Sequence, residues 1–209
     1  MAPTDEWIRD GGRVCLDLAN TLRDRWSVPH ETLVDPSDLT RWLHGAGLLA
    51  TEGLPSPSDA TLHQARLLRE AIDRAVLTTA EGRLPTQDDI NLINETVAAA
   101  PRPLLQLTIT DDHLTTSSTD TPVNDATAAL GLIARDAIDL LVSPEVTRVR
   151  VCASDRCGLR FVDRSQGGRR RWCSMSRCGN RTKAQRHHLR LRTPDTNDSA
   201  AGMEDKPYP

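Results

Sequence analysis

The sequence predicts a mainly α-helical chain with a small β-hairpin (class α+β), followed by a small C-terminal module that contains four cysteines. Three observations support this prediction. Apolar residues recur at helical spacing in several segments between residues 14 and 142. Residues 105–110 instead alternate apolar with polar side chains, which is the period of a half-buried strand. Four of the five cysteines fall in two short-spaced pairs beyond residue 150.

The first two helical segments are short. Residues 14–22 form either a short helix or an extended segment. A second helix starts at Asp35-Pro36, because aspartate caps a helix N-terminus and proline suits the first helical position. Gly45 ends this helix, and its apolar face consists of Leu39, Trp42 and Leu43.

Three longer helices follow. Residues 59–79 carry leucine, alanine, isoleucine and valine at helical spacing. Thr86 and Asp89 form a capping-box pattern at the start of the next helix. Residues 126–142 show the clearest helical pattern, and Ser143-Pro144 stops it because the residue before a proline disfavours helical geometry.

The remaining segments have other patterns. Strand 105–110 leads through a turn at Asp111-Asp112 into a second strand near Leu114. Residues 148–151 alternate arginine and valine and are expected to enter the cysteine module as a strand. Residues 193–209 lack periodicity, so a disordered tail is predicted there.

Composition excludes several classes of protein. The chain is 38% hydrophobic and 26% charged, as expected for a globular protein. No apolar run approaches the roughly 18 residues that a membrane helix requires, and the N-terminus lacks the pattern of a secretory signal. We therefore expect a cytoplasmic protein without a membrane partner. Cytoplasmic thiols stay reduced, which favours metal binding over disulfides.

Positive charge is concentrated at one end of the chain. Residues 148–192 hold fourteen Lys and Arg against two Asp and Glu, a formal charge of +12. The rest of the chain holds twelve against twenty-seven, or −15, although the net charge is only −3. This asymmetry indicates a polyanionic partner for the C-terminal segment.

The four C-terminal cysteines have the spacing of a structural metal site. Cys152 and Cys157 are separated by four residues, as are Cys173 and Cys178, and fifteen residues join the pairs. Four thiolates complete the tetrahedral shell of one structural Zn²⁺ ion and leave no position open for catalysis. A treble-clef-like finger is therefore predicted. An iron–sulfur cluster, and ligation by His187 or His188, are the alternatives.

The basic segment offers candidate contacts to double-stranded DNA. A helix over about residues 180–190 would begin near the metal and lie on or in a groove. Three consecutive arginines after Gly167-Gly168 would contact phosphates or a minor groove. The predicted DNA-binding residues are Arg169, Arg170, Arg171, Arg177, Asn180, Arg181, Lys183, Gln185, Arg186, His187 and Arg190.

Several short motifs resemble a known pair of domains. The segments Phe161-Val-Asp163, Trp172-Cys-Ser-Met175 and Cys178-Gly-Asn-Arg181 resemble the CGNR zinc finger. Residues 14–21 and 39–48 resemble the ABATE domain that occurs with it, except that Cys15 replaces an expected aliphatic residue and is predicted to be a buried core thiol. The resemblance implies the same four cysteine ligands and a stress-linked bacterial transcription regulator whose finger binds DNA.

These observations define a predicted organisation. Residues 1–146 form a helical sensor or dimerisation domain, residues 147–192 form the finger, and residues 193–209 form the tail. Polar residues of the first motif and one tryptophan are candidates for a pocket that binds a small-molecule effector. A helix cap or polar packing explains the three polar residues equally well, and core packing is the favoured explanation for the tryptophan. These candidates are Asp17, Asn20, Thr21 and Trp42.

The predicted function is transcription regulation by a nucleoid-associated protein that binds double-stranded DNA through its zinc finger. The helical domain is expected to sense an effector or to form a homodimer. The alternative is an adaptor that binds RNA or an acidic protein surface. An enzyme is not expected, because no carboxylate pair accompanies the arginines and the thiolate shell is closed. A redox response of the thiolates is a further hypothesis.

Overall fold

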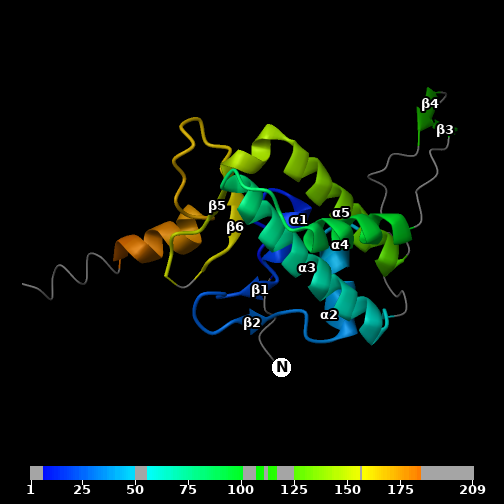
Figure 1. The fold of residues 1–209 in the computed structure, drawn as a ribbon, viewed down its shortest axis with the longest axis horizontal. Helices are drawn as coiled ribbons and strands as arrows, with labels where there is room; N and C mark the ends of the chain where they lie inside the picture. The colour runs from blue at the N-terminus through cyan, green and yellow to red at the C-terminus, as the bar shows by residue number, and fades with distance from the viewer. Residues whose placement is uncertain are drawn as a thin grey trace, which may run out of the picture. The chain divides into compact units, whose positions relative to one another are not determined.

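The computed structural model describes residues 7–49, 56–100, 107–110, 113–116, 125–155 and 157–184, with only the backbone of 107–110 and 113–116 (Figure 1). Its contacts divide the chain into two units, residues 1–173 and 174–209. The predicted domain limits stay a prediction. Three of the four predicted cysteine ligands, Cys152, Cys157 and Cys173, belong to the first unit together with the helices and the strands β5 (Val149–Val151) and β6 (Arg160–Val162).

The described residues of the first unit form five α-helices, in accord with the predicted fold class. They are α1 (Val14–Ala19), α2 (Pro36–Gly45), α3 (Asp59–Ala80), α4 (Gln87–Ala99) and α5 (Ala126–Val142). A short 3₁₀ helix, η1 (Pro144–Arg148), follows α5. No helix in the described part of the chain is both long and apolar enough to span a membrane.

Local sequence signals explain where the helices begin. The Asp35 side chain accepts a hydrogen bond from the Asp38 N–H, and Pro36 occupies the first turn of α2. Thr86 accepts from the Asp89 N–H at the start of α4, as the capping-box pattern predicts. These side chains satisfy amide donors that have no partner within the helix.

The helices pack around one apolar core. α3 lies against α1, α4 and α5, and α4 packs on α5 as well. Leu39, Trp42 and Leu43 of α2 are fully buried, as predicted for its apolar face, and Cys15 of α1 is a buried core thiol. Apart from Trp42 and Cys15, the buried residues of this core are Leu, Ile, Val and Ala.

The described residues contain three antiparallel strand pairs in addition to the helices. The sequence predicts one hairpin and one further strand. The three pairs are β1 (Leu22–Arg23) with β2 (His30–Glu31), β3 (Leu107–Thr110) with β4 (His113–Thr116), and β5 (Val149–Val151) with β6 (Arg160–Val162). β3 and β4 confirm the predicted hairpin. Its turn at Asp111-Asp112, residues 105–106 and the predicted tail lie outside the described residues.

Arginine–carboxylate pairs connect the β1–β2 hairpin to α3. Arg69 of α3 contacts both carboxylate oxygens of Glu31, at 2.7 and 2.8 Å. Arg25, in the loop between the strands, donates to Glu70 of α3 at 2.6 Å. Because Arg69 is almost fully buried, its two bonds to Glu31 compensate for the loss of its hydration.

The core packing gives a stability prediction. Leu68→Ala, on the fully buried face of α3, is expected to lower the free energy of unfolding by roughly 2–5 kcal/mol, because the truncation leaves a cavity. Leu84→Ala is the matched control, since Leu84 is 91% exposed, and it should change stability by less than about 0.5 kcal/mol. Denaturant unfolding followed by circular dichroism measures both. Equal stabilities of the two variants would contradict the assignment of the core.

Candidate metal centre and nucleic-acid interface

The first cysteine pair lies on the loop that joins β5 to β6. Val149 pairs with Val162 and Val151 with Arg160, so the loop begins and ends at neighbouring positions. The Cys152 N–H donates to the Leu159 carbonyl at 2.8 Å, which closes the loop at its base. The turn therefore directs both cysteines of the first pair to the same side.

Gly158, next to Cys157, cannot be replaced by a larger residue without strain. Its φ is +66°, a left-handed conformation that L side chains rarely adopt. A Cβ atom at this position would also lie only 2.8 Å from the Trp26 ring. Backbone conformation and close packing both require glycine at this turn.

A short helical turn follows Cys173 and contains Cys178, the other cysteine of the second pair. Ser174 caps η2, a π-helical turn over Met175–Gly179, by accepting a hydrogen bond from the Arg177 N–H. The Cys178 N–H donates to the Ser174 carbonyl at 3.0 Å. The backbone continues as α-helix over residues 180–184, which confirms the start of the predicted basic helix.

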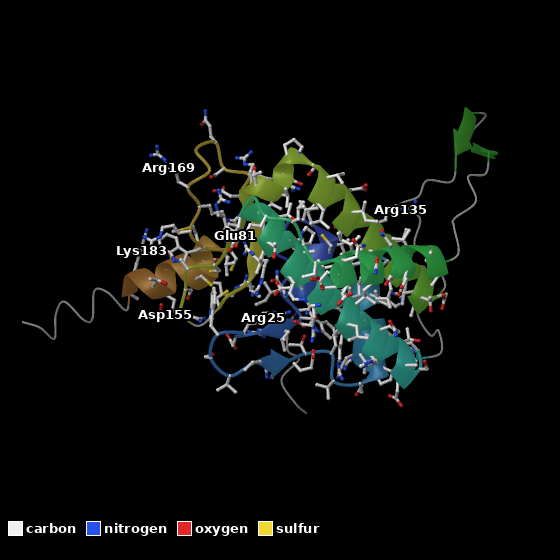
Figure 2. The ribbon with its side chains drawn as sticks, viewed as in Figure 1. Arg25, Glu81, Arg135, Asp155, Arg169 and Lys183 are labelled. Atoms are coloured by element: carbon white, nitrogen blue, oxygen red, sulfur yellow. The ribbon has the colours of Figure 1, made fainter. Side chains whose placement is uncertain are left out.

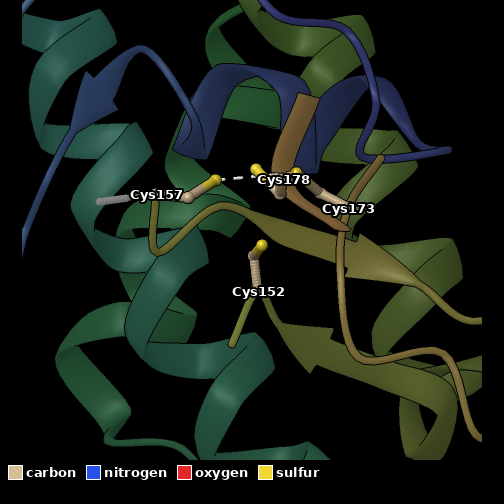
Figure 3. A group of neighbouring side chains, drawn as sticks. All are labelled: Cys152, Cys157, Cys173 and Cys178. Atoms are coloured by element: carbon tan, nitrogen blue, oxygen red, sulfur yellow. Dashed lines mark hydrogen bonds between the residues drawn. The ribbon is translucent and has the colours of Figure 1, made fainter. Parts of the chain in front are cut away.

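The four sulfur atoms converge. The Sγ atoms of Cys152, Cys157, Cys173 and Cys178 all lie within 4.8 Å of one another, and all four residues are buried (Figure 3). A tetrahedral ion with Zn–S bonds of about 2.3 Å would separate its sulfurs by about 3.8 Å. The Cys157 and Cys173 sulfurs are 3.5 Å apart. The donor set and its spacing therefore fit one structural Zn²⁺ ion.

The sulfur spacing also affects the protonation of these thiols. Hydrogen bonds from Cys157 and Cys173 lower the pKa of Cys152, whereas the bond with Cys152 is the main cause that raises the pKa of Cys157. Thiolates with sulfurs this close repel one another, so the four thiols cannot all ionise without a compensating charge. A bound Zn²⁺ ion supplies that charge and keeps coordinating thiols deprotonated.

A buried aspartate organises the loop between the two halves of the finger. One carboxylate oxygen of Asp163 accepts from the Ser165 N–H at 2.9 Å and from its hydroxyl at 2.5 Å. The other accepts from the Arg170 N–H at 2.8 Å. These bonds, first of all the one from the Ser165 hydroxyl, lower the pKa of Asp163. The loop is therefore held in a defined conformation despite Gly167 and Gly168.

The three consecutive arginines differ in their surroundings. Arg169 is exposed, and its side chain extends away from the loop (Figure 2). Arg171 is exposed and lies over the Trp172 ring, 5.4 Å from its centroid. Arg170 is exposed as well, but it donates to the carbonyls of Trp172 and Cys173 and lies 4.8 Å from the centroid of Phe161. Arg170 therefore fixes the backbone at Cys173, the first cysteine of the second pair.

The other predicted contact residues lie in the second unit. Asn180, Arg181 and Lys183 are exposed, whereas Arg177 is half-buried. Gln185, Arg186, His187 and Arg190, together with the alternative ligand His188, lie outside the described residues. Contact of any of these residues with DNA stays a prediction.

Two arginines of the basic segment are paired with acids of the first unit. Arg160 is buried and contacts both carboxylate oxygens of Asp73 in α3, at 2.5 and 2.9 Å. Arg164 donates to Glu145 at 2.8 Å. The formal charge of +12 that the sequence gives for residues 148–192 includes both arginines, although both are paired. For Arg160, the sequence offered one indication of this pairing: Asp73 is an acid beside the apolar face of a predicted helix, where a buried carboxylate needs a cationic partner.

The residues proposed for an effector pocket are held by internal contacts. Trp42 is fully buried in the core, and the Thr21 hydroxyl donates to the Leu18 carbonyl at 2.7 Å. Asn20 exchanges two hydrogen bonds with the backbone of Arg160. Asp17 accepts from the Gly11 N–H at 2.9 Å. The effector role of these residues stays a prediction. A separate cavity of about 280 Å³ lies between α3, α4 and α5.

The site and fold together define a zinc-finger protein whose closed centre consists of four cysteines. Two family models match the chain. ABATE, described as "Putative stress-induced transcription regulator", matches residues 12–144, and the CGNR zinc finger matches residues 148–191. The first match covers more than half of the chain, so the chain belongs to the ABATE family and carries a CGNR zinc finger. No curated protein matches it.

The ligand set gives a prediction about metal content. Cys178→Ser is expected to lower the zinc content well below one ion per chain, because a hydroxyl is a poor replacement for a thiolate. Cys15→Ala is the matched control, since Cys15 is buried in the helical core and should leave zinc at one ion per chain. Elemental analysis of the purified proteins measures both. Full zinc in Cys178→Ser would contradict the assignment.

Asp17 gives a pH prediction. Burial raises its pKa from 3.8 to about 6, although the Gly11 N–H and Arg9 act in the opposite direction. The folded chain therefore keeps a proton that the unfolded chain releases, so this residue makes stability fall as pH rises from about 4 to 6. Relative to wild type, Asp17→Asn should gain roughly 2–3 kcal/mol across this window.

Unfolding by urea at several pH values, with the exposed Asp139→Asn as control, measures this difference. A stability difference between Asp17→Asn and wild type that does not change with pH would contradict the shifted pKa.

Proposed function

We propose that this protein regulates transcription by binding double-stranded DNA through its zinc finger. The observation that carries the proposal is a set of exposed cationic and amide side chains next to the metal ligands in the sequence. They are Arg169, Arg171, Asn180, Arg181 and Lys183. Arginine and lysine at a structured surface attract phosphates and release counterions, and asparagine can pair with adenine edges.

The charge distribution supports the same proposal after correction for internal pairs. Arg160 and Arg164 are each paired with an acid, and the guanidinium of Arg170 is bound to backbone carbonyls. The remaining basic residues still far outnumber the two acids of residues 148–192, and Asp163 is fully buried. The finger therefore has little negative charge to repel a phosphate backbone.

We further propose that the chain is a regulator and not an enzyme. Four thiolates complete the coordination of a tetrahedral ion, so the centre has no open position for water or substrate. The helical residues would then sense an effector or bring two chains together, so that two fingers contact two half-sites. Binding of this kind would place the protein on the nucleoid.

The experiment uses full-length zinc-loaded protein and labelled genomic duplexes over a range of salt concentrations. Binding should weaken steeply with salt, with a log–log slope of about −0.9 for each phosphate contacted. Arg181→Gln combined with Lys183→Gln should weaken binding to all duplexes and make the slope shallower by up to about 2. Arg83→Gln is the control, because Arg83 is an exposed arginine beyond the end of α3.

Two results would contradict the proposal. One is the absence of zinc-dependent binding to any duplex at low salt. The other is displacement of the duplex by structured RNA at lower concentration, which would favour the RNA-binding adaptor.

A further inference from the structure

The turn that carries Cys157 is held by residues from outside the finger. The Asn20 side chain, just after α1, donates to the Arg160 carbonyl at 2.9 Å and accepts from the Arg160 N–H at 2.8 Å. One buried amide thereby satisfies both backbone groups of a residue three positions after a metal ligand. This contact joins parts of the chain 140 residues apart.

The side chain of the same residue is fixed to α3. Arg160 and Asp73 are each 7% exposed and form a two-point ion pair, and Arg160 also donates to the Gly158 carbonyl at 2.5 Å. The guanidinium therefore connects α3 directly to the backbone next to Cys157. Within the protein interior such a pair has few other conformations available.

The hairpin itself forms part of the helical core. Val149 of β5 and Val162 of β6 are buried in the same apolar cluster as the residues of α1, α3 and α5. The Val162 N–H donates to the Gly11 carbonyl at 2.9 Å, and Trp26 packs against Gly158. The helices and the segments next to them thus set the conformation of the loop that carries Cys152 and Cys157.

We propose that Asn20 and Asp73 are positioning residues for the zinc centre, so that zinc binding is coupled to the stability of the packed helices α1, α3 and α5. A residue that favours the liganded conformation of the Cys152–Cys157 loop raises zinc affinity. By linkage, bound zinc stabilises the packing that holds the loop. Loss of zinc therefore loosens α1 and α3 as well as the finger. The inference rests on the metal site and not on DNA binding.

The first test measures zinc affinity of the full-length protein by competition with a chromophoric chelator. Asn20→Ala and Asp73→Asn should each weaken zinc binding by about 10-fold, the lower end of the range for residues that hydrogen-bond a ligand directly, because both act through Arg160. Asn94→Ala and Asp139→Asn are matched controls on exposed helix surfaces and should bind zinc as wild type does.

A core variant separates positioning from general destabilisation. Ile93→Ala removes a buried side chain of α4, a helix that packs on α3 and α5. It should lower the melting temperature and leave zinc affinity within about twofold of wild type, since it does not touch the cysteine loop. Zinc affinities of Asn20→Ala and Asp73→Asn equal to that of Ile93→Ala would overturn the proposal.

The second test needs no substitution and therefore does not depend on whether a variant folds. Hydrogen exchange of wild-type protein is compared before and after removal of zinc by a chelator. Peptides from α1 and from the middle of α3 should exchange faster without zinc, whereas peptides from α4 should change less. Unchanged exchange in α1 and α3, with the change confined to residues 152–184, would overturn the coupling.

Discussion

The convergence of four cysteine sulfurs is the constraint on which the rest of the finger depends. Thiols with sulfurs this close cannot all ionise without repulsion between the thiolates, a conflict that follows from their spacing. A divalent ion removes the conflict and supplies folding free energy to a segment with few apolar residues. The β5–β6 turn, the Asp163 loop and the capped turn at Ser174 all hold backbone on either side of these sulfurs.

The basic residues around this centre fall into two groups. Arg160 and Arg170 have their guanidinium groups bound to internal acceptors and position the backbone next to metal ligands. The second group, Arg169, Arg171, Arg181 and Lys183, is exposed, and Arg170 of the first group is exposed as well. Some arginines of the segment therefore stabilise the fold. A count of all its arginines overstates the charge that is available to a phosphate backbone.

Much of the fold was predictable because its signals are local. Helix α5 has the predicted bounds, since an apolar stripe precedes Ser143-Pro144, and Asp35-Pro36 starts α2 as expected. The cysteine spacing identified the metal ligands for the same reason. β1 and β2 were missed because a ladder of two residues per strand leaves almost no pattern in the sequence.

The role of the helical residues in the site was not predictable from local patterns. Asn20 contacts a residue 140 positions away, and Asp73 contacts one 87 positions away. Only the folded chain brings them together. The sequence motif that contains Asp17, Asn20 and Thr21 looked equally compatible with a pocket, a cap or polar packing, and its observed contacts are internal.

X-ray absorption at the zinc edge of protein purified without chelators tests the central claim most directly. The account predicts one zinc ion per chain surrounded by four sulfur atoms at about 2.3 Å. A shell that contains nitrogen or oxygen ligands, fewer than four sulfurs, or an iron signal in place of zinc would contradict it.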